Sequence, residues 1–281
     1  ANFVAGICWI WRPFLSDLWG AIYKTLDKPS KVRSTVWTNQ VAHALGWLLA
    51  FLTHKADTMT RVYHLRHHLR PTASLTIASD ASPWGMGSLL FIDGILVAAF
   101  YSAVCAHDEA KFGKRRGHNE GQQVWELLIV LVALRHWADR WPMTKFVLEV
   151  KSDNIAALVA TGSLKASGDN ANLIARELAL DYGAAAYQPT VITHTPGICN
   201  RVPDWISRCE EPGSRPPRPS VLDDIAIETP ADRDDRFYLA APLPKDSKSR
   251  KRELLQRQWR KDVKHRYLRA KLAIAKSRSA S

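Results

Sequence analysis

The sequence predicts a mixed α/β fold for residues 72–208, in which a five-stranded sheet is flanked by helices. Three observations predict it. Asp93-Gly94 lies between two apolar runs, which is a strong signal for a β-hairpin. Val124–Leu134 is apolar on nearly every side and is long enough for a buried helix. Strand-like and helix-like segments then alternate to the end of the region, as they do where helices pack on a mixed sheet.

The individual elements follow from local composition and from turn residues. Short runs of β-branched and apolar residues predict strands at 74–79, 86–92, 95–102, 145–150 and 190–193. Longer apolar segments predict helices at 124–134, 154–160, 171–184 and 202–208. Gly162 and Gly168 lie between the two middle helices. The resulting order, β-β-β-α-β-α-α-β-α, is the reason for expecting a single mixed sheet.

The parts of the chain outside this region are predicted to differ from it. Residues 1–71 are expected to be helical, because the apolar positions of Val41–Leu52 recur with the helical period and Thr38 or Asn39 can cap the start. Residues 209–244 are rich in proline and glycine, which indicates a flexible linker with little structure. Residues 245–281 form a basic tail, and a narrow apolar stripe within it predicts a helix.

The net charge of +12 is concentrated in that tail. Residues 245–281 hold 14 Lys or Arg and three acids, so the tail carries +11 and the rest of the chain +1. A basic arm on a neutral body usually binds a polyanion, and nucleic acid is a commoner partner than a membrane. The longest uncharged apolar stretch, Val41–Leu52, has 12 residues, against the roughly 20 needed to cross a bilayer. No membrane association is therefore expected.

The four cysteines, Cys8, Cys105, Cys199 and Cys209, show no C-x-x-C spacing and no short disulfide pattern. Free or buried thiols in a reducing compartment are expected, which predicts an intracellular protein of the cytoplasm or nucleus. The chain begins with Ala and not with Met, which suggests a piece of something longer. An apolar fraction of 46% and a charged fraction of 23% exclude a wholly disordered or collagen-like chain.

Four carboxylates occupy positions that are energetically costly or structurally informative. Asp80 ends the strand-like run SLTIAS, and Asp153 directly follows the run KFVLEV. Glu126 is the only ionisable residue in Val124–Leu134, where an unpaired carboxylate costs several kcal/mol. Asp204 lies in the last predicted helix. Each of them alone has an ordinary explanation as a cap, a turn residue, a solvated acid or a salt-bridge partner.

Together the four acids predict a metal centre. Residues that end neighbouring strands or lie on nearby helices are expected to meet at one edge of the sheet. An anionic cluster of this kind repels itself unless divalent cations neutralise it, and all-oxygen ligands select Mg²⁺ or Mn²⁺. Two such ions ~4 Å apart stabilise the in-line hydrolysis of a phosphodiester.

Four pieces of the sequence carry a resemblance to a known family. They are IASDASPWGMG, VWELLIVLVALRHW, LEVKSDNIAALVATGS and ITHTPGICNRVPDWISR. In this order they resemble the type 1 ribonuclease H domain, in the form fused to the reverse transcriptases of retrotransposons. The pieces cover about residues 74–208, close to half of the chain, and the H-x-P-G-x-x-N-x-x-x-D-x-x-S-R pattern in the last is the most specific.

The resemblance implies a ribonuclease H-like fold and hydrolysis of the RNA strand of RNA–DNA hybrids, as part of a retroelement replication protein. It implies a metal-binding tetrad of Asp80, Glu126, Asp153 and Asp204, with two Mg²⁺ ions for which Mn²⁺ can substitute. Asp80 would bridge both ions, and Asp204 would hold the second. Glu120 is the alternative to Glu126, which is preferred for its place on the buried helix.

The resemblance also implies roles for residues around the tetrad. His194, in a loop ten residues before the last acid, is expected to move protons or release product. Asn154 and Asn200 are expected to contact 2′-hydroxyl groups, which distinguish RNA from DNA. The basic residues before the buried helix are expected either to hold the substrate backbone or to be merely solvated. These are Lys114, Arg115 and Arg116.

Two other functions stay open at this point. The chain could be a catalytically idle, nucleic-acid-binding relic of a retroelement, or another nuclease or integrase of the same fold. Residues 1–71 resemble the stretch between polymerase and ribonuclease in such elements, which makes the rest of a polymerase polyprotein a possible partner. Polymerase active-site residues are not found: the Asp-Asp pairs at 223–224 and 234–235 both follow the ribonuclease-like region.

The basic tail is expected to supply substrate affinity. The segment Leu164–Asp169 contains only one basic residue, Lys165, where many free-standing cellular enzymes carry a basic protrusion. Phosphate contacts from residues 245–278 would replace it through counterion release. Truncation after residue 244 is therefore expected to weaken hybrid binding and flatten its salt dependence. Unchanged affinity of the truncated chain in a low-salt binding titration would contradict this role.

Overall fold

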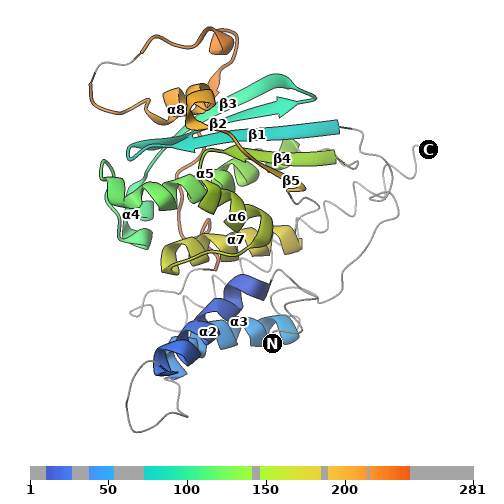
Figure 1. The fold of residues 1–281 in the computed structure, drawn as a ribbon, viewed down its shortest axis with the longest axis vertical. Helices are drawn as coiled ribbons and strands as arrows, with labels where there is room; N and C mark the ends of the chain where they lie inside the picture. Colours follow the sequence, from blue (N-terminus) through green and yellow to red (C-terminus); the bar gives the residue numbers. More distant parts are fainter. Residues whose placement is uncertain are drawn as a thin grey trace, which may run out of the picture. The chain divides into compact units, whose positions relative to one another are not determined.

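The computed structural model describes residues 11–26, 38–53, 73–140, 146–184, 189–213 and 216–240 (Figure 1). The chain divides into two compact units. One comprises Tyr63–Ile174 and Tyr187–Tyr238, and holds the sheet. The other comprises Ala1–Val62, Ala175–Ala186 and Leu239–Ser281. The predicted basic tail, residues 245–281, lies outside the described residues.

The first unit is built on a mixed six-stranded sheet with the order β5-β4-β1-β2-β3-β6. Strands β1, β2 and β3 form an antiparallel meander, β4 and β5 run parallel to β1, and β6 runs parallel to β3. The strands are β1 (Ala73–Ala81), β2 (Gly85–Ile92), β3 (Ile95–Ala103), β4 (Phe146–Ser152), β5 (Val191–His194) and β6 (Ile227–Glu228). The predicted mixed sheet is confirmed, but the predicted number of five strands is wrong, because β6 joins the free edge of β3.

The β2–β3 turn confirms the hairpin predicted from Asp93-Gly94. Asp93 has φ 50° and Gly94 has φ 82°, so both residues adopt the left-handed conformation that a two-residue hairpin turn requires. Asp93 also ties the turn to the start of β1, because its Oδ1 accepts a hydrogen bond from the Ser74 amide at 2.7 Å. The turn therefore sets the register of β2 against β3, with Ile92 opposite Ile95, and Asp93 also links it to β1.

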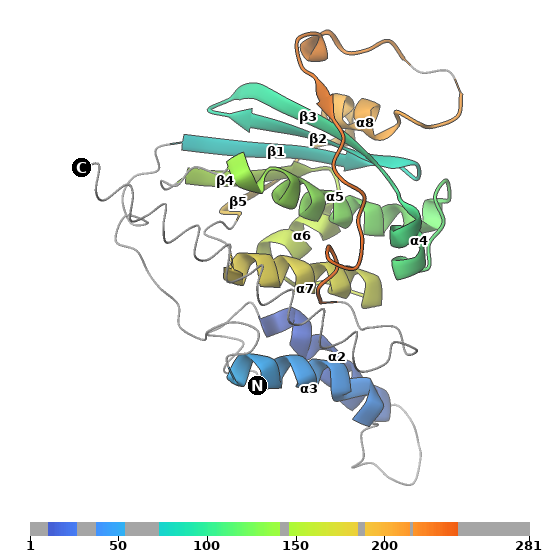
Figure 2. The same ribbon diagram turned by 180° about the vertical axis from the view of Figure 1, so that it is seen from behind.

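Helices cover both faces of the sheet. They are α4 (Ala106–Phe112), α5 (Gln122–His136), α6 (Ile155–Ser163), α7 (Asp169–Ala184), which continues into the other unit, and α8 (Arg201–Ser207). Helix α5 packs against β1 and β2, α6 packs against β4 and β5, and α8 packs against the first three strands. Both views show α5 and α6 on one side of the sheet and α8 on the other (Figures 1 and 2).

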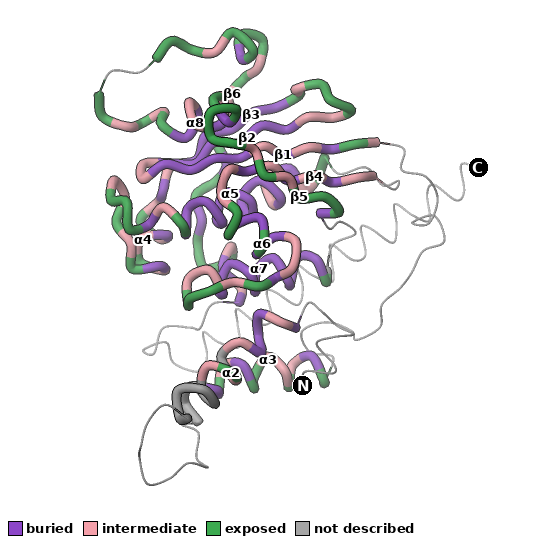
Figure 3. Tube along the Cα trace, viewed as in Figure 1, coloured by how far each residue is buried: buried purple, intermediate pink, exposed green. Residues whose placement is uncertain are grey.

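The core of this unit lies between α5 and the sheet. Every residue of Val124–Leu134 is buried, which confirms the predicted buried helix, and the buried positions run along α5 and the central strands (Figure 3). Helix α4 was not predicted, because AHDEAKF shows no apolar period. It begins after Cys105, whose amide donates to Asp108 Oδ2 at 3.0 Å, and it ends at Gly113 with φ 62°.

The prediction of a flexible linker at 209–244 is wrong for residues 216–238, which belong to the sheet unit and pack on it. Leu222 is fully buried with Leu89, Ala99 and Ile206, and β6 follows it. Arg233, only 3% exposed, pairs with the buried Asp108, with Nε 2.8 Å from Oδ2. Proline and glycine content predicts irregular backbone, and it does not reveal whether that backbone is anchored.

The second unit contains the helices α2 (Arg12–Leu26) and α3 (Thr38–Leu52). Aromatic rings join them: Trp11, directly before α2, stacks on Phe51 of α3 at 5.4 Å, and Phe14 of α2 meets Phe51 edge-on at 5.2 Å. The expected helical segment is confirmed for these ranges. Helix α3 begins at Thr38, so Thr38 and Asn39 lie in its first turn instead of preceding it. No helix in the described ranges is long and apolar enough to cross a bilayer.

Candidate metal centre

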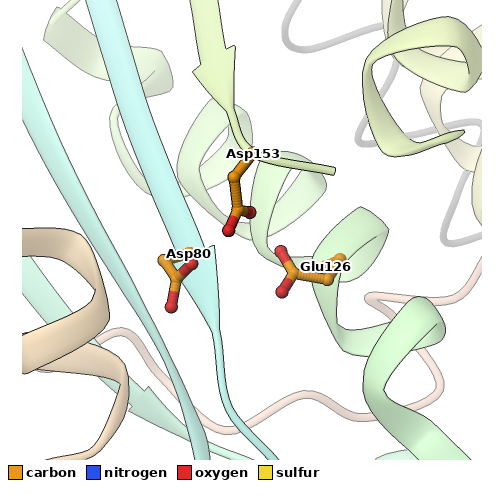
Figure 4. Close-up of side chains that lie close together, drawn as sticks. All are labelled: Asp80, Glu126 and Asp153. Atoms are coloured by element: carbon orange, nitrogen blue, oxygen red, sulfur yellow. The ribbon is translucent and has the colours of Figure 1, made fainter. Parts of the chain in front are cut away.

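Three carboxylates from three elements meet at one edge of the sheet (Figure 4). Asp80 lies near the end of β1, and Asp153 directly follows β4. The two strands are parallel neighbours with Ala78 opposite Lys151, so two residues further along both chains reach the same level. Glu126 comes from α5, which packs on β1. One oxygen from each carboxylate lies within 4.8 Å of the others.

Asp80 is held in place from both sides. Asn200 Nδ2 donates to its Oδ1 at 3.1 Å, and Ser207 Oγ donates to its Oδ2 at 3.0 Å. The side chain is only 4% exposed. Burial, followed by the charges of Asp153 and Asp204, raises the pKa of Asp80 from 3.8 to about 7. Its carboxylate is therefore fixed in position and costly to ionise without a cation.

Within the described residues, only one of the two carboxylate oxygens of Glu126 accepts a hydrogen bond. Gln122 Nε2, one turn earlier on α5, donates to Oε1 at 2.8 Å. The second oxygen, Oε2, is buried and has no hydrogen-bond partner among the described residues. Burial, followed by the charges of Asp80 and Asp153, raises the pKa of Glu126 from 4.5 to about 9. A divalent cation between the three carboxylates would give this oxygen a partner and remove the repulsion.

Asp204, the fourth predicted ligand, is not part of this cluster. It lies on α8 with its side chain 44% exposed, and its Oδ1 accepts from Arg208 Nε at 2.7 Å. Its charge still contributes to the raised pKa of Asp80. The structure therefore groups three of the four predicted acids and turns the fourth toward an arginine one turn further along its own helix.

Of the other predicted site residues, His194 and Asn154 lie next to the cluster, and Asn200 holds one of its carboxylates in place. His194 ends β5 opposite Ser152, and its side chain is exposed. Asn154 caps α6, because its Oδ1 accepts from the Ala157 amide at 3.0 Å. Asn200 is buried and positions Asp80, with a second bond from its Nδ2 to the Ser79 carbonyl at 3.2 Å.

The three predicted basic residues differ in the side chains and backbone groups that they contact. Lys114 Nζ lies 3.4 Å from Glu120 Oε2, and Arg115 is exposed. Arg116 pairs with Glu210 and donates from Nε to the Trp84 carbonyl at 3.0 Å. Glu120, the alternative ligand, lies in a 3-10 turn with an exposed side chain, so the preference for Glu126 agrees with the structure.

Three residues around the cluster were not singled out from the sequence. Gln122 donates a hydrogen bond to Glu126, and Ser207 donates one to Asp80. Gly197 lies close to Asp153, since a Cβ added to this glycine would be 3.3 Å from Asp153 Oδ2. Signals for all three were available. Gln122 stands four residues before Glu126 on the helix, where side chains meet. Gly197 and Ser207 are fixed positions of the H-x-P-G-x-x-N-x-x-x-D-x-x-S-R pattern.

The cluster has the chemistry of a hard-cation site. Its donors are carboxylate oxygens, which divalent ions such as Mg²⁺ and Mn²⁺ prefer and which soft metals do not. Three cysteines of the described ranges, Cys105, Cys199 and Cys209, form no disulfide there and lie outside the cluster. A scan against protein-family models finds none that matches this chain, and no curated protein matches it either. The residues can hold a metal ion, and the geometry is what indicates it.

Proposed function

We propose that this chain is a metal-dependent ribonuclease H of retroelement type, which hydrolyses the RNA strand of RNA–DNA hybrids. The observation that carries the proposal is the buried cluster of Asp80, Glu126 and Asp153 with an unpartnered carboxylate oxygen. The sheet order β5-β4-β1-β2-β3, with an antiparallel meander followed by parallel strands, is compatible with the ribonuclease H-like fold. The HTPGICNRVPDWISR stretch supplies both residues that hold Asp80.

The proposed cofactor is a pair of Mg²⁺ ions, for which Mn²⁺ can substitute. Asp80, Glu126 and Asp153 would hold the first, and Asp204 would contribute to the second once Arg208 releases its carboxylate. When bound, such ions lower the pKa of the attacking water and neutralise charge at the scissile phosphate. The two bonds to Asp80 would keep its oxygens oriented for this task.

Protein side chains would perform the remaining steps. The exposed imidazole of His194, at the strand end beside the cluster, would exchange protons or assist product release. Asn154 uses its Oδ1 to cap α6, which leaves its Nδ2 as a donor for a 2′-hydroxyl. Asn200 acts through Asp80 and is a positioning residue. Arg115 and Lys114 could approach the substrate backbone, whereas Arg116 holds Glu210.

The proposed setting is an intracellular polyprotein that also contains a polymerase. Residues 245–278, outside the described residues, would add phosphate contacts.

A cleavage assay with labelled hybrid in Mg²⁺ tests the proposal. The native chain is expected to cut the RNA strand, and Asp153→Asn is expected to be at least about 1,000-fold slower, since loss of ~4 kcal/mol of transition-state stabilisation has that effect. Asp139→Asn makes the same change on an exposed acid outside the cluster and should cut like the native chain.

Three results would contradict or redirect the proposal. Equal inactivity of the native chain and Asp153→Asn would favour a binding relic. Cleavage of duplex DNA in preference to hybrid would favour another nuclease or integrase. Full activity in a chelator would exclude a metal-dependent reaction.

A further inference from the structure

A groove of about 650 Å³ lies between α8 and the segment 216–221. The segment belongs to the region that packs on the sheet unit instead of forming a loose linker. Three arginines line the groove: Arg201 and Arg208 from α8, and Arg218 from the opposite wall.

Two of these arginines have no carboxylate partner within the part of the chain that the structure describes. Arg208 is neutralised by Asp204 and by Glu211, whose Oε2 lies 2.9 Å from Nη1. Arg218 donates from Nη2 to the backbone carbonyls of Leu222 and Ile225, at 2.6 and 2.8 Å. Carbonyl groups orient the guanidinium without cancelling its charge. Arg201 is exposed, and within the described ranges neither it nor Arg218 forms an ion pair with a carboxylate.

Two residues of the groove lining lie close to the carboxylate cluster. Gly197 lines the groove, and the same residue lies against Asp153, since a Cβ added to it would be 3.3 Å from Oδ2. Asp204 also lines the groove, and its charge raises the pKa of Asp80. The groove therefore lies near the cluster, on the side of Gly197 and Asp204.

An aromatic side chain completes the lining. Trp205 Nε1 donates to the Pro216 carbonyl at 2.9 Å, which fixes the indole and joins the two walls. A fixed aromatic ring beside cations suits a sugar–phosphate backbone, because a sugar can pack on the ring while phosphates meet the cations, as they do in proteins that bind nucleic-acid strands.

We propose that this groove binds the sugar–phosphate backbone of the nucleic-acid strand that continues beyond the carboxylate cluster. Arg201 and Arg218 contact phosphates, and Trp205 packs against a sugar. The proposal rests on the proposed function for the identity of the strand. It adds a substrate-binding surface made partly by residues 216–221, outside the stretch that resembles ribonuclease H.

Substitutions at Arg201 test the groove with little risk to folding, because its side chain is exposed. Hybrid affinity is measured by fluorescence anisotropy in EDTA, so that the substrate stays intact, over a series of salt concentrations. Arg201→Gln is expected to weaken binding about three- to tenfold and to reduce the slope of log K against log salt by about 1. Arg201→Glu should weaken binding further, and Arg201→Lys should retain most of the affinity.

Arg236→Gln is the matched control, since it removes the same charge from an exposed side chain that does not line the groove. It is expected to change affinity less than twofold. Native affinity and native salt slope for both Arg201→Gln and Arg201→Glu would overturn the groove proposal. Cleavage by the native chain is scored separately: cutting without a groove effect contradicts only the groove, and a groove effect without cutting contradicts only the nuclease.

Discussion

Glu126→Gln is expected to stabilise the metal-free protein while it abolishes hybrid cleavage. At pH 8 the free energy of unfolding should rise by about 3 kcal/mol, because each unit by which burial and neighbouring charges raise the pKa of Glu126 is worth about 1.4 kcal/mol. The amide of the introduced glutamine is also desolvated on burial. The gain in the free energy of unfolding is therefore smaller than the pKa shift alone would give. Gln122 can still donate to the remaining Oε1. Cleavage should fall at least about 1,000-fold.

The sign of the pH dependence follows from the direction of the shifts. Between pH 4.5 and 9 the folded protein retains a proton on Glu126 that the unfolded chain has lost. Stability of the metal-free protein should therefore decrease as pH rises through this range. Asp80 adds to the decrease up to about pH 7. Chemical denaturation at several pH values in EDTA measures the slope, and Glu126→Gln should flatten it most between pH 7 and 9.

Divalent cations should reverse this trend in the native chain. Mg²⁺ competes with protons for the same oxygens, so the increase in melting temperature on adding Mg²⁺ should be larger at pH 8.5 than at pH 6. The increase should be nearly absent in Glu126→Gln. This readout needs no substrate and reports on the cluster alone.

Glu120→Gln is the matched control for both measurements. It makes the same chemical change six residues earlier on an exposed side chain. Native stability and native cleavage are expected. If Glu120→Gln lost cleavage and Glu126→Gln kept it, the metal centre described above would be wrong.

Local patterns were sufficient to predict the elements and acids that form the cluster. The Asp93-Gly94 turn needs only two residues with positive φ, and the burial of α5 follows from an apolar run that no amphipathic helix shows. Parallel neighbouring strands then bring Asp80 and Asp153 to the same level. Each inference uses residues close together in sequence or a general property of sheets.

The remaining features depend on pairings between distant residues. Arg233 and Asp108 are 125 residues apart, and neither stands out in its own segment. Asp204 differs, because its partner Arg208 stands four residues further along the same helix, where opposite charges commonly pair. That spacing was visible in the sequence and predicts that Asp204 has a competing partner when no cation is bound.

Arg233→Met is expected to be the most destabilising single change in the 216–240 segment. It would leave the fully buried carboxylate of Asp108 without its cation and remove the bond from Nη1 to Ser102 Oγ at 2.6 Å. Breaking a buried pair from one side costs about 3–5 kcal/mol. Chemical denaturation should show a loss of this size, and amide exchange should accelerate in residues 216–240 before it does in α5.

Two further variants separate the ion pair from simple loss of packing. Arg140→Met makes the same change at an exposed pair with Glu228, and should cost less than about 1 kcal/mol. Asp108→Leu with Arg233→Met removes both charges, so the double variant should regain a large part of the lost stability even though Tyr238 loses its acceptor. If Arg233→Met were as mild as Arg140→Met, residues 216–240 would not be anchored by this pair. Another interaction would then have to hold residues 216–221 in place as one wall of the groove.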